Sequence, residues 1–198
     1  MEQDPKPSQV VPRPAEVHLL STGYVAEYAA GLRVASTVSF VADVDSLIVI
    51  DPGMVSDQSS ILGPLKGLAV DPAEVTDVIL SHHHPDHTIN AGLFPNASIH
   101  DYWAIYKRDM WIDRAAEGTQ LSPAVRLIAT PGHTPQDITT LVSTAEDVVA
   151  FTHLWWTAEG PEIDPRATDM EAIRANRVRV LEVATLIVPA HGAPFRPR

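Results

Sequence analysis

Four of the nine histidines in this sequence lie in one short stretch, LSHHHPDHTINAG, which covers residues 80–92. His82 and His84 are one residue apart, and Asp86 is followed directly by His87. Neutral imidazole is the commonest protein ligand of zinc and related divalent ions, and carboxylate oxygen is another frequent ligand. This spacing predicts a metal-binding loop, because a fold alone would accept almost any polar residue at these positions.

Three further apolar segments also end in histidine. They read LIATPGHT, VVAFTH and LIVPAHG, and they supply His133, His153 and His191. Because ligands of sheet proteins gather where strands end in loops, these four strand ends predict one site along one edge of a sheet. The sequence contains no cysteine, so a metal in this site would be bound by nitrogen and oxygen atoms.

The elements that must position these loops follow from the pattern of apolar residues. Apolar and β-branched residues on both sides of the turn-forming DVDS predict two hairpin-linked strands. We expect strands within residues 32–40, 47–50, 75–81, 98–100, 125–134, 137–143, 147–153 and 185–192, helices at 58–68 and 167–184, and a helix or irregular connection at 101–118. Strands and helices that alternate in this way indicate the α/β or α+β class.

The string H-x-H-x-D-H at residues 82–87 resembles the metal-binding signature of the metallo-β-lactamase superfamily. The later PGHT and PAHG resemble that superfamily's third and last metal motifs in the correct order, and VIDPG, ending at Gly53, resembles its strand-end aspartate motif. GLFPNA, TPGHTPQDI and VPAHGAPF resemble the subgroup of small hydrolases that contains metallo-β-lactamase domain-containing protein 1. The resemblance extends over residues 17–195 and implies an αβ/βα sandwich, with two mixed β-sheets face to face and helices outside.

The resemblance also implies which residues bind metal. It implies two groups of three ligands, one for each of two ions: His82, His84 and His133, then Asp86, His87 and His191. Zinc is the expected cofactor, as one or two ions, with iron or manganese as alternatives because these ligands suit several first-row metals. Asp86 would also orient the attacking hydroxide, so it is the expected catalytic residue. His153 stands where most two-metal members carry a bridging aspartate, and it is either an extra ligand of the second ion or a bystander.

Other polar residues and loops near these motifs have less specific assignments. Asp51, in the DPG motif, is either a turn former or a partner that orients a metal-bound histidine. His83 would point away from its neighbours in an extended loop, so we expect it to be structural. His18 and His100 lie outside any motif and are also expected to be structural. Substrate selection is expected from short loops near Trp103–Trp111 and Trp155–Glu162.

Length and charge limit the class of protein further. A chain of 198 residues is long enough for one sizeable core, so we expect a single domain at residues 16–198 after a flexible proline-rich tail at 1–15. The net charge of −11 should repel phosphate backbones and anionic lipid, so we expect a small-molecule substrate and neither nucleic acid nor a membrane as partner. The sequence shows no secretory signal pattern and no apolar run of membrane-spanning length, so the expected location is the cytoplasm. Nothing in the sequence predicts the oligomeric state.

The predicted function is that of a metal-dependent hydrolase. A zinc-bound hydroxide would cleave an ester, thioester, amide or phosphoester bond in a small substrate, because three neutral imidazoles leave an ion its full charge and lower the pKa of bound water to about 7. Three alternatives are an RNA-processing nuclease, a mononuclear iron oxygenase of the same fold, and a non-catalytic metal-binding domain.

Overall fold

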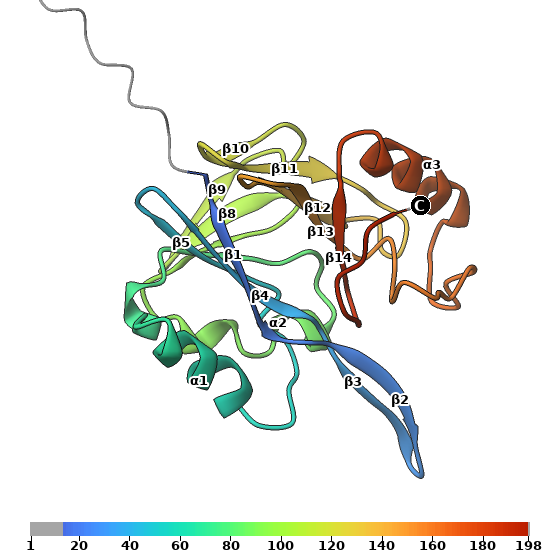
Figure 1. Ribbon diagram of the computed structural model, residues 1–198, viewed down its shortest axis with the longest axis horizontal. Coiled ribbons are helices and arrows are strands. Elements are labelled where there is room, and N and C mark those ends of the chain that lie inside the picture. The colour runs from blue at the N-terminus through green and yellow to red at the C-terminus, as the bar shows by residue number, and fades with distance from the viewer. Residues whose placement is uncertain (1–13, 198) are drawn as a thin grey trace, which may run out of the picture.

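Two β-sheets packed face to face form the centre of the molecule (Figure 1). The computed structural model describes residues 14–197, so most of the predicted tail at residues 1–15 lies outside the described residues. Seven strands form the first sheet and five form the second. A helix packs on the outer side of each sheet, which confirms the predicted αβ/βα sandwich of two mixed sheets.

The first sheet has parallel pairing in its middle and antiparallel pairing toward its edges. Its strands, in spatial order, are β1 (Glu16–Ser21), β4 (Val38–Asp43), β5 (Ser46–Ile50), β6 (Asp77–Ile79), β7 (Ser98–His100), β8 (Ala104–Lys107) and β9 (Met110–Asp113). Strands β5, β6 and β7 run parallel, and the other neighbours run antiparallel. Helix α1 (Ser59–Gly67) joins β5 to β6 on the outer face of this sheet, with a short 3₁₀ turn at Pro72–Glu74.

The second sheet carries three of the four segments that end in histidine. Its strands are β10 (Gln120–Ser122), β11 (Val125–Ala129), β12 (Ile138–Ser143), β13 (Val148–Thr152) and β14 (Leu186–Pro189). Only the β13–β14 pair is parallel, and helix α3 (Met170–Leu181) connects these two strands across the outer face. The two predicted helices are thus confirmed as α1 and α3, although α3 is shorter at both ends than the predicted 167–184.

Side chains of the central strands are buried on both faces. In β5, Ile48 and Ile50 face the core between the sheets, whereas Val49 faces α1. In β14, Val188 faces the same central core and Ile187 faces α3. Successive side chains of a strand point to opposite faces, so a strand covered on both sides reads as an unbroken apolar run, as LIVI and LIVP do. Each fully buried aliphatic side chain contributes roughly 1.5–3 kcal/mol to folding.

The predicted strand at residues 32–40 is in fact two strands. Strand β3 (Gly31–Ala35) pairs with β2 (Tyr24–Tyr28) in a separate hairpin that projects from the body, and the chain then enters β4. Ser36 and Thr37 break the strand because their polar groups bind elsewhere. The Ser36 hydroxyl donates to the carbonyl of Asp51 at 2.8 Å, and the Thr37 N–H donates to the carbonyl of Ala190 at 2.6 Å.

Residues 101–118 do not form the expected helix or irregular connection. They contain the hairpin of β8 and β9, in which Tyr106 lies opposite Trp111 with ring centroids 4.7 Å apart. Arg108, with φ of 56°, makes the tight turn between them. Aromatic cross-strand pairs of this kind stabilise a hairpin and override weak helical spacing. Strands β1, β2 and β10 were also not predicted.

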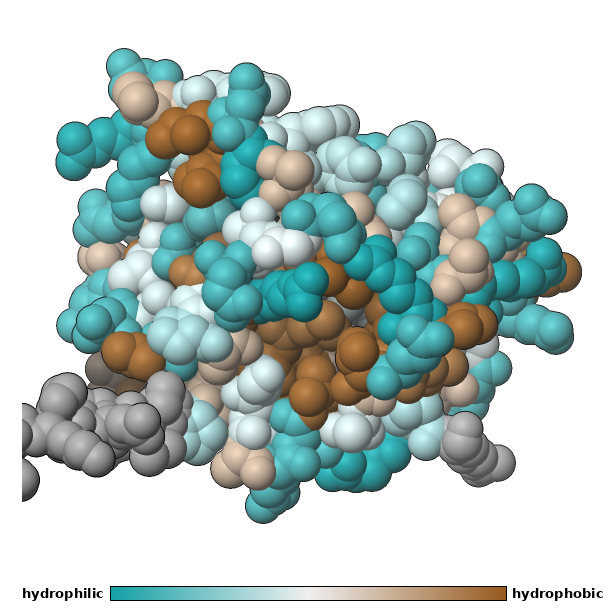
Figure 2. Space-filling view, turned by 90° about the horizontal axis from the view of Figure 1, so that it is seen from above, coloured by the Kyte–Doolittle hydropathy of each residue, from teal (hydrophilic) through white to brown (hydrophobic). Residues whose placement is uncertain are grey.

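Hydrophilic side chains cover most of the face seen in Figure 2, around a central group of hydrophobic ones. Within residues 14–197, no helix is both long enough and apolar enough to cross a membrane.

Candidate metal centre

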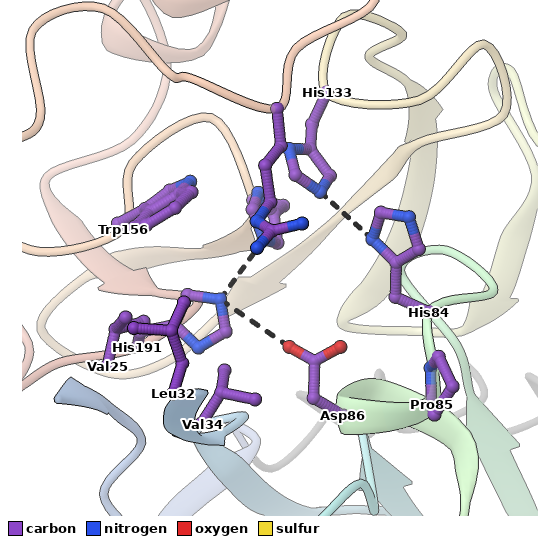
Figure 3. A pocket seen from close by; sticks show the side chains of 11 residues that line it. Val25, Leu32, Val34, His84, Pro85, Asp86, His133, Trp156 and His191 are labelled. Atoms are coloured by element: carbon purple, nitrogen blue, oxygen red, sulfur yellow. Dashed lines mark hydrogen bonds and ion pairs between the residues drawn. The ribbon is translucent and has the colours of Figure 1, made fainter. Parts of the chain in front are cut away.

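The strands β6, β11, β13 and β14 all deliver their histidine loops to one pocket (Figure 3). The loop after β6 contains the short helix α2 (Pro85–Thr88), whose first turn carries Asp86 and His87, and a 3₁₀ turn at Ala91–Leu93 follows it. The pocket has a volume of about 260 Å³. His84, Asp86, His133 and His191 line it and turn toward one another, as Figure 3 shows.

The first predicted group, His82, His84 and His133, converges on one point. His84 Nδ1 lies 3.0 Å from His82 Nε2 and 3.0 Å from His133 Nε2. His133 Nδ1 donates to a carboxylate oxygen of Asp164 at 2.7 Å, so its Nε2 presents a lone pair to the group. Ser81 Oγ lies 3.1 Å from His82 Nδ1, so a proton on Nδ1 would have an acceptor and Nε2 would then present a lone pair as well. A proton on His84 Nδ1 would satisfy one of these lone pairs, whereas a metal ion would bind all three nitrogens, so the donor set fits a metal ion.

The second predicted group, Asp86, His87 and His191, lies beside the first. An oxygen of Asp86 is 3.5 Å from His87 Nε2 and 3.7 Å from His191 Nε2. His191 Nδ1 donates to the carbonyl of Ala35 at 2.9 Å, which leaves its Nε2 free to bind a cation. His87 Nε2 is buried and has no hydrogen-bond partner among the described residues. An unpartnered buried nitrogen that faces a carboxylate and a second imidazole is a position that a metal ion would satisfy.

Asp51 orients one of these histidines. One of its carboxylate oxygens accepts from His87 Nδ1 at 2.9 Å, and the other accepts from the backbone N–H of Ser81 at 2.7 Å. The structure therefore places Asp51 in the second of its two expected roles, while its φ of 50° shows that it also shapes the turn. A side chain on Gly53 would overlap the backbone of Asp86, so the glycine of the DPG motif lets the two segments approach.

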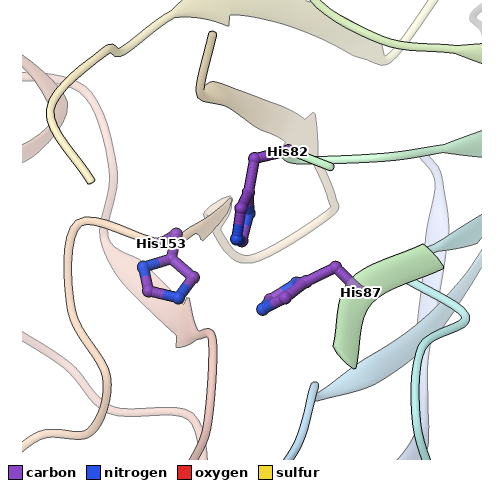
Figure 4. A group of neighbouring side chains, drawn as sticks. All are labelled: His82, His87 and His153. Carbon is purple, nitrogen blue, oxygen red and sulfur yellow. The ribbon is translucent and has the colours of Figure 1, made fainter. Parts of the chain in front are cut away.

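His153 lies between the two groups and does not point away (Figure 4). It is 3% exposed, its ring stacks on that of His133 at 3.8 Å, and its Nε2 lies 3.2 Å from His191 Nε2. One nitrogen of His153 lies within 4.8 Å of ligand nitrogens of both His82 and His87. His153 Nδ1 has no hydrogen-bond partner among residues 14–197. This geometry favours an additional ligand over a bystander.

Burial keeps most of these imidazoles neutral. Burial, followed by neighbouring histidines, holds the pKa of both His82 and His153 well below the ordinary value. Burial also lowers the pKa of His191, to about 4, and that of His84, to which the charges of His133 and Arg166 contribute as well. Neutral imidazole is the form that binds metal, so protons compete weakly for these nitrogens near pH 7.

His87 differs because a carboxylate accompanies it. Burial works against its charged form, but the charge of Asp51 and the hydrogen bond to it outweigh burial, so the pKa of His87 is raised. The same negative field favours any cation at Nε2, whether a proton or a metal ion.

Asp164 is the residue of this site that sequence reasoning missed. It is buried, it accepts from His133 Nδ1, and it also accepts from Trp156 Nε1 at 3.0 Å. It belongs to the irregular connection between β13 and α3, where no metal motif marks it. Burial raises its pKa, but the hydrogen bonds from His133 and the Arg166 backbone outweigh this and lower it. An ionised Asp164 orients His133 as Asp51 orients His87.

The remaining histidines bind other partners. His83 Nε2 lies 2.9 Å from a carboxylate oxygen of Asp101, and His100 Nε2 lies 2.8 Å from one of Asp77, whereas His18 lies at the surface near Glu16. None of the three contributes to the pocket.

The pocket wall is only partly the one expected. Trp156, from the predicted loop at Trp155–Glu162, lines it, but no residue of Trp103–Trp111 does. The wall is completed by Arg166 and by the apolar side chains of Val25, Leu32 and Val34 from the β2–β3 hairpin.

Comparison with known proteins agrees with this geometry. The sequence profile of the metallo-β-lactamase superfamily matches residues 31–192. The chain belongs to the metallo-β-lactamase superfamily. It is 31% identical over 197 residues to metallo-β-lactamase domain-containing protein 1 of Xenopus laevis, a match that covers 96% of this chain and 84% of the frog protein. The human protein of the same name is 37% identical over 158 residues, which cover 75% of this chain and 59% of the human one. Both the family and the subgroup predicted from the sequence are thereby confirmed.

Solved structures support the fold. A Thermotoga maritima crystal structure, provisionally described as a metallo-β-lactamase, is similar to this chain with a TM-score of 0.77 and 22% identity, covering 93% of this chain and 100% of that one. An N-acyl homoserine lactone hydrolase with the product N-hexanoyl-L-homoserine bound at its catalytic metal centre is similar with a TM-score of 0.66 and 18% identity, covering 91% and 93%. At these identities the likeness establishes the fold alone.

Proposed function

We propose that the protein is a metal-dependent hydrolase that cleaves an ester, thioester, amide or phosphoester bond in a small substrate, with zinc as its resident metal. One observation supports this most strongly. Two adjoining groups of three nitrogen and oxygen donors, with proton positions fixed by Asp51, Asp164 and the carbonyl of Ala35, open together into one pocket. A non-catalytic metal site would have no need of such an opening.

The residues present suit the chemistry of hydrolysis. When bound, the ions would supply Lewis acidity and lower the pKa of a water molecule to about 7. His82, His84 and His133 are neutral donors, so they do not reduce the positive charge at the first position. Asp86 is the only carboxylate among the described residues that line the pocket, so it is the group that would hold and orient the attacking water.

The walls and the charge of the chain suit a small substrate. A pocket of about 260 Å³ bounded by a projecting hairpin accommodates a small molecule more readily than a polymer. The net charge of −11 works against phosphate-backbone binding. We therefore favour a small ester, thioester, amide or phosphoester over RNA.

Hydrolysis of a panel of chromogenic esters, thioesters, amides and phosphoesters by the purified zinc-loaded protein tests this proposal. We expect turnover of at least one class, loss of that activity with chelator and its return with added zinc. The Asp86→Asn variant should lose turnover while it retains at least one ion. Turnover that survives complete metal removal, or none on any class with metal bound, would refute the assignment. Oxygen consumption during turnover would indicate an iron oxygenase instead.

A further inference from the structure

One cationic side chain in the pocket has no role in metal binding. Arg166 lines the pocket together with His84, His133 and Trp156. Its side chain is exposed and makes no hydrogen bond or ion pair with any residue in the described range 14–197. Arg177, by contrast, is occupied. Arg177 Nε donates to the carbonyl of Leu154 at 2.8 Å.

The backbone of Arg166 is fixed relative to the metal ligands. Its N–H donates to Asp164 Oδ1 at 2.8 Å, while the other oxygen of Asp164 accepts from His133 and Trp156. Asp164 makes no ion pair with the guanidinium two residues away. The next turn is tied down too, because the N–H of Thr168 lies 2.9 Å from the carbonyl of Gly132. These bonds hold the backbone of Arg166 to the loop that carries His133.

The charge of the pocket differs from that of the chain. The sequence has 25 acidic and 14 basic residues, yet the described pocket lining holds Arg166 and only one carboxylate, that of Asp86. Divalent ions in the two groups would add further positive charge. A planar guanidinium donates two parallel N–H bonds to a carboxylate or phosphate group, which makes it selective for such groups.

We propose that Arg166 selects substrates that carry an oxyanion group, a carboxylate or a phosphate, away from the bond that is cleaved. The inference rests on the proposed hydrolase function. The oxyanion meets Arg166 and Trp156, the scissile group lies over Asp86 and the histidines, and any apolar part packs against Val25 and Leu32 of the hairpin. Arg166 is thus a specificity-determining residue and not a catalytic one.

Matched aryl acetates test the inference on the zinc-loaded protein. Para-carboxyphenyl acetate and para-phosphonophenyl acetate carry an oxyanion, and para-carbamoylphenyl acetate is a neutral analogue of the same size. The wild-type kcat/KM should be about 10-fold higher for one or both anionic esters, the magnitude expected of a partly exposed charge-assisted pair. Arg166→Gln should abolish that preference, so that the anionic and neutral esters have about equal kcat/KM, and Arg166→Lys should restore part of the preference. Arg174→Gln, which removes an exposed arginine of α3, is the matched control.

Binding provides a readout that does not need turnover. Calorimetry with para-hydroxybenzoate and para-hydroxybenzamide should show that Arg166→Gln weakens binding of the carboxylate ligand and not that of the amide. If the neutral ester is hydrolysed but neither rate nor binding depends on Arg166, this inference is wrong and the proposed function stands. If no ester is hydrolysed but the carboxylate still binds through Arg166, the function fails and the anion site stands. If Arg166→Gln still prefers the anionic esters, the metal ions select the substrate and the role proposed for the arginine is wrong.

Discussion

Replacing Asp164 by asparagine should weaken metal binding at the first group alone. Asp164 is 4% exposed, and its carboxylate accepts from His133 Nδ1 at 2.7 Å, a short charge-assisted hydrogen bond. The amide keeps the volume but loses the charge, so His133 becomes a poorer and less firmly oriented ligand. Removal of such a partner typically lowers metal affinity about 10–100-fold, or about 1.4–2.8 kcal/mol.

Competition titration against a zinc-binding dye measures this loss, and a second variant supplies a reciprocal control. Asp51→Asn should weaken the second group, because Asp51 orients His87 and not His133. In a His84→Ala background, where the first group is disabled, Asp51→Asn should still lower the remaining affinity and Asp164→Asn should not. If Asp164→Asn leaves zinc affinity at its wild-type value, or lowers it equally in both backgrounds, the orienting role is refuted.

The other predictions concern a close backbone approach, the altered bridging position and the effect of pH. Gly53→Ala should lower the free energy of unfolding by about 1–3 kcal/mol in a denaturant titration and weaken binding of the second ion, because the new methyl group overlaps the backbone of Asp86. His153→Asp should raise second-ion affinity in a zinc titration by restoring a carboxylate, and His153→Ala should lower it while the first ion is spared. Burial opposes ionisation of Asp77, but hydrogen bonds from His100 and Thr76 outweigh it and lower the pKa of Asp77. The ionised carboxylate therefore stabilises the fold above pH about 4, and this stabilisation is lost as the pH falls through the lower pKa of the folded state. In Asp77→Asn, the free energy of unfolding should fall less steeply as the pH is lowered.

Each of these has a matched control. Gly92→Ala places a methyl group where no atom lies within 4 Å, so it should be neutral. Asp109→Asn removes an exposed carboxylate in the β8–β9 turn and should leave this pH dependence unchanged. Unchanged zinc affinity in both His153 variants would show that His153 is a bystander. If the free energy of unfolding of Asp77→Asn still falls as steeply at low pH as that of the wild type, other carboxylates cause the acid sensitivity.

The fold and the histidine motifs could be predicted because each depends on patterns within short stretches of the sequence. Runs such as LIVI mark strands covered on both faces, and the spacing of residues 82–87 allows few structures other than a metal loop. Asp164 could not be found this way, because it lies 31 residues from His133 and only the packed connection brings them together. The apolar wall from Val25 and Leu32 was missed for the same reason, since those residues are distant in sequence from every histidine motif.

Local pattern was also misleading where tertiary pairing decided the structure. Residues 101–118 have spacing that a helix would accept, but pairing of Tyr106 with Trp111 at the edge of the first sheet makes them a hairpin. That difference removed one of the two expected substrate loops from the pocket. The assignment of Asp51 could be decided only from its hydrogen bond to His87, which no sequence pattern distinguishes from a turn.

Elemental analysis of the purified protein shows directly whether this pocket is a metal centre. We expect one or two divalent ions per chain in the wild type and the loss of one of them in His84→Ala. His83→Ala changes the adjacent residue and removes contacts with Asp101 and Trp103, neither of which lines the pocket, so it should retain the wild-type metal content. Absence of bound metal from the wild type, or equal loss in the two variants, would contradict the assignment of this pocket as a metal centre.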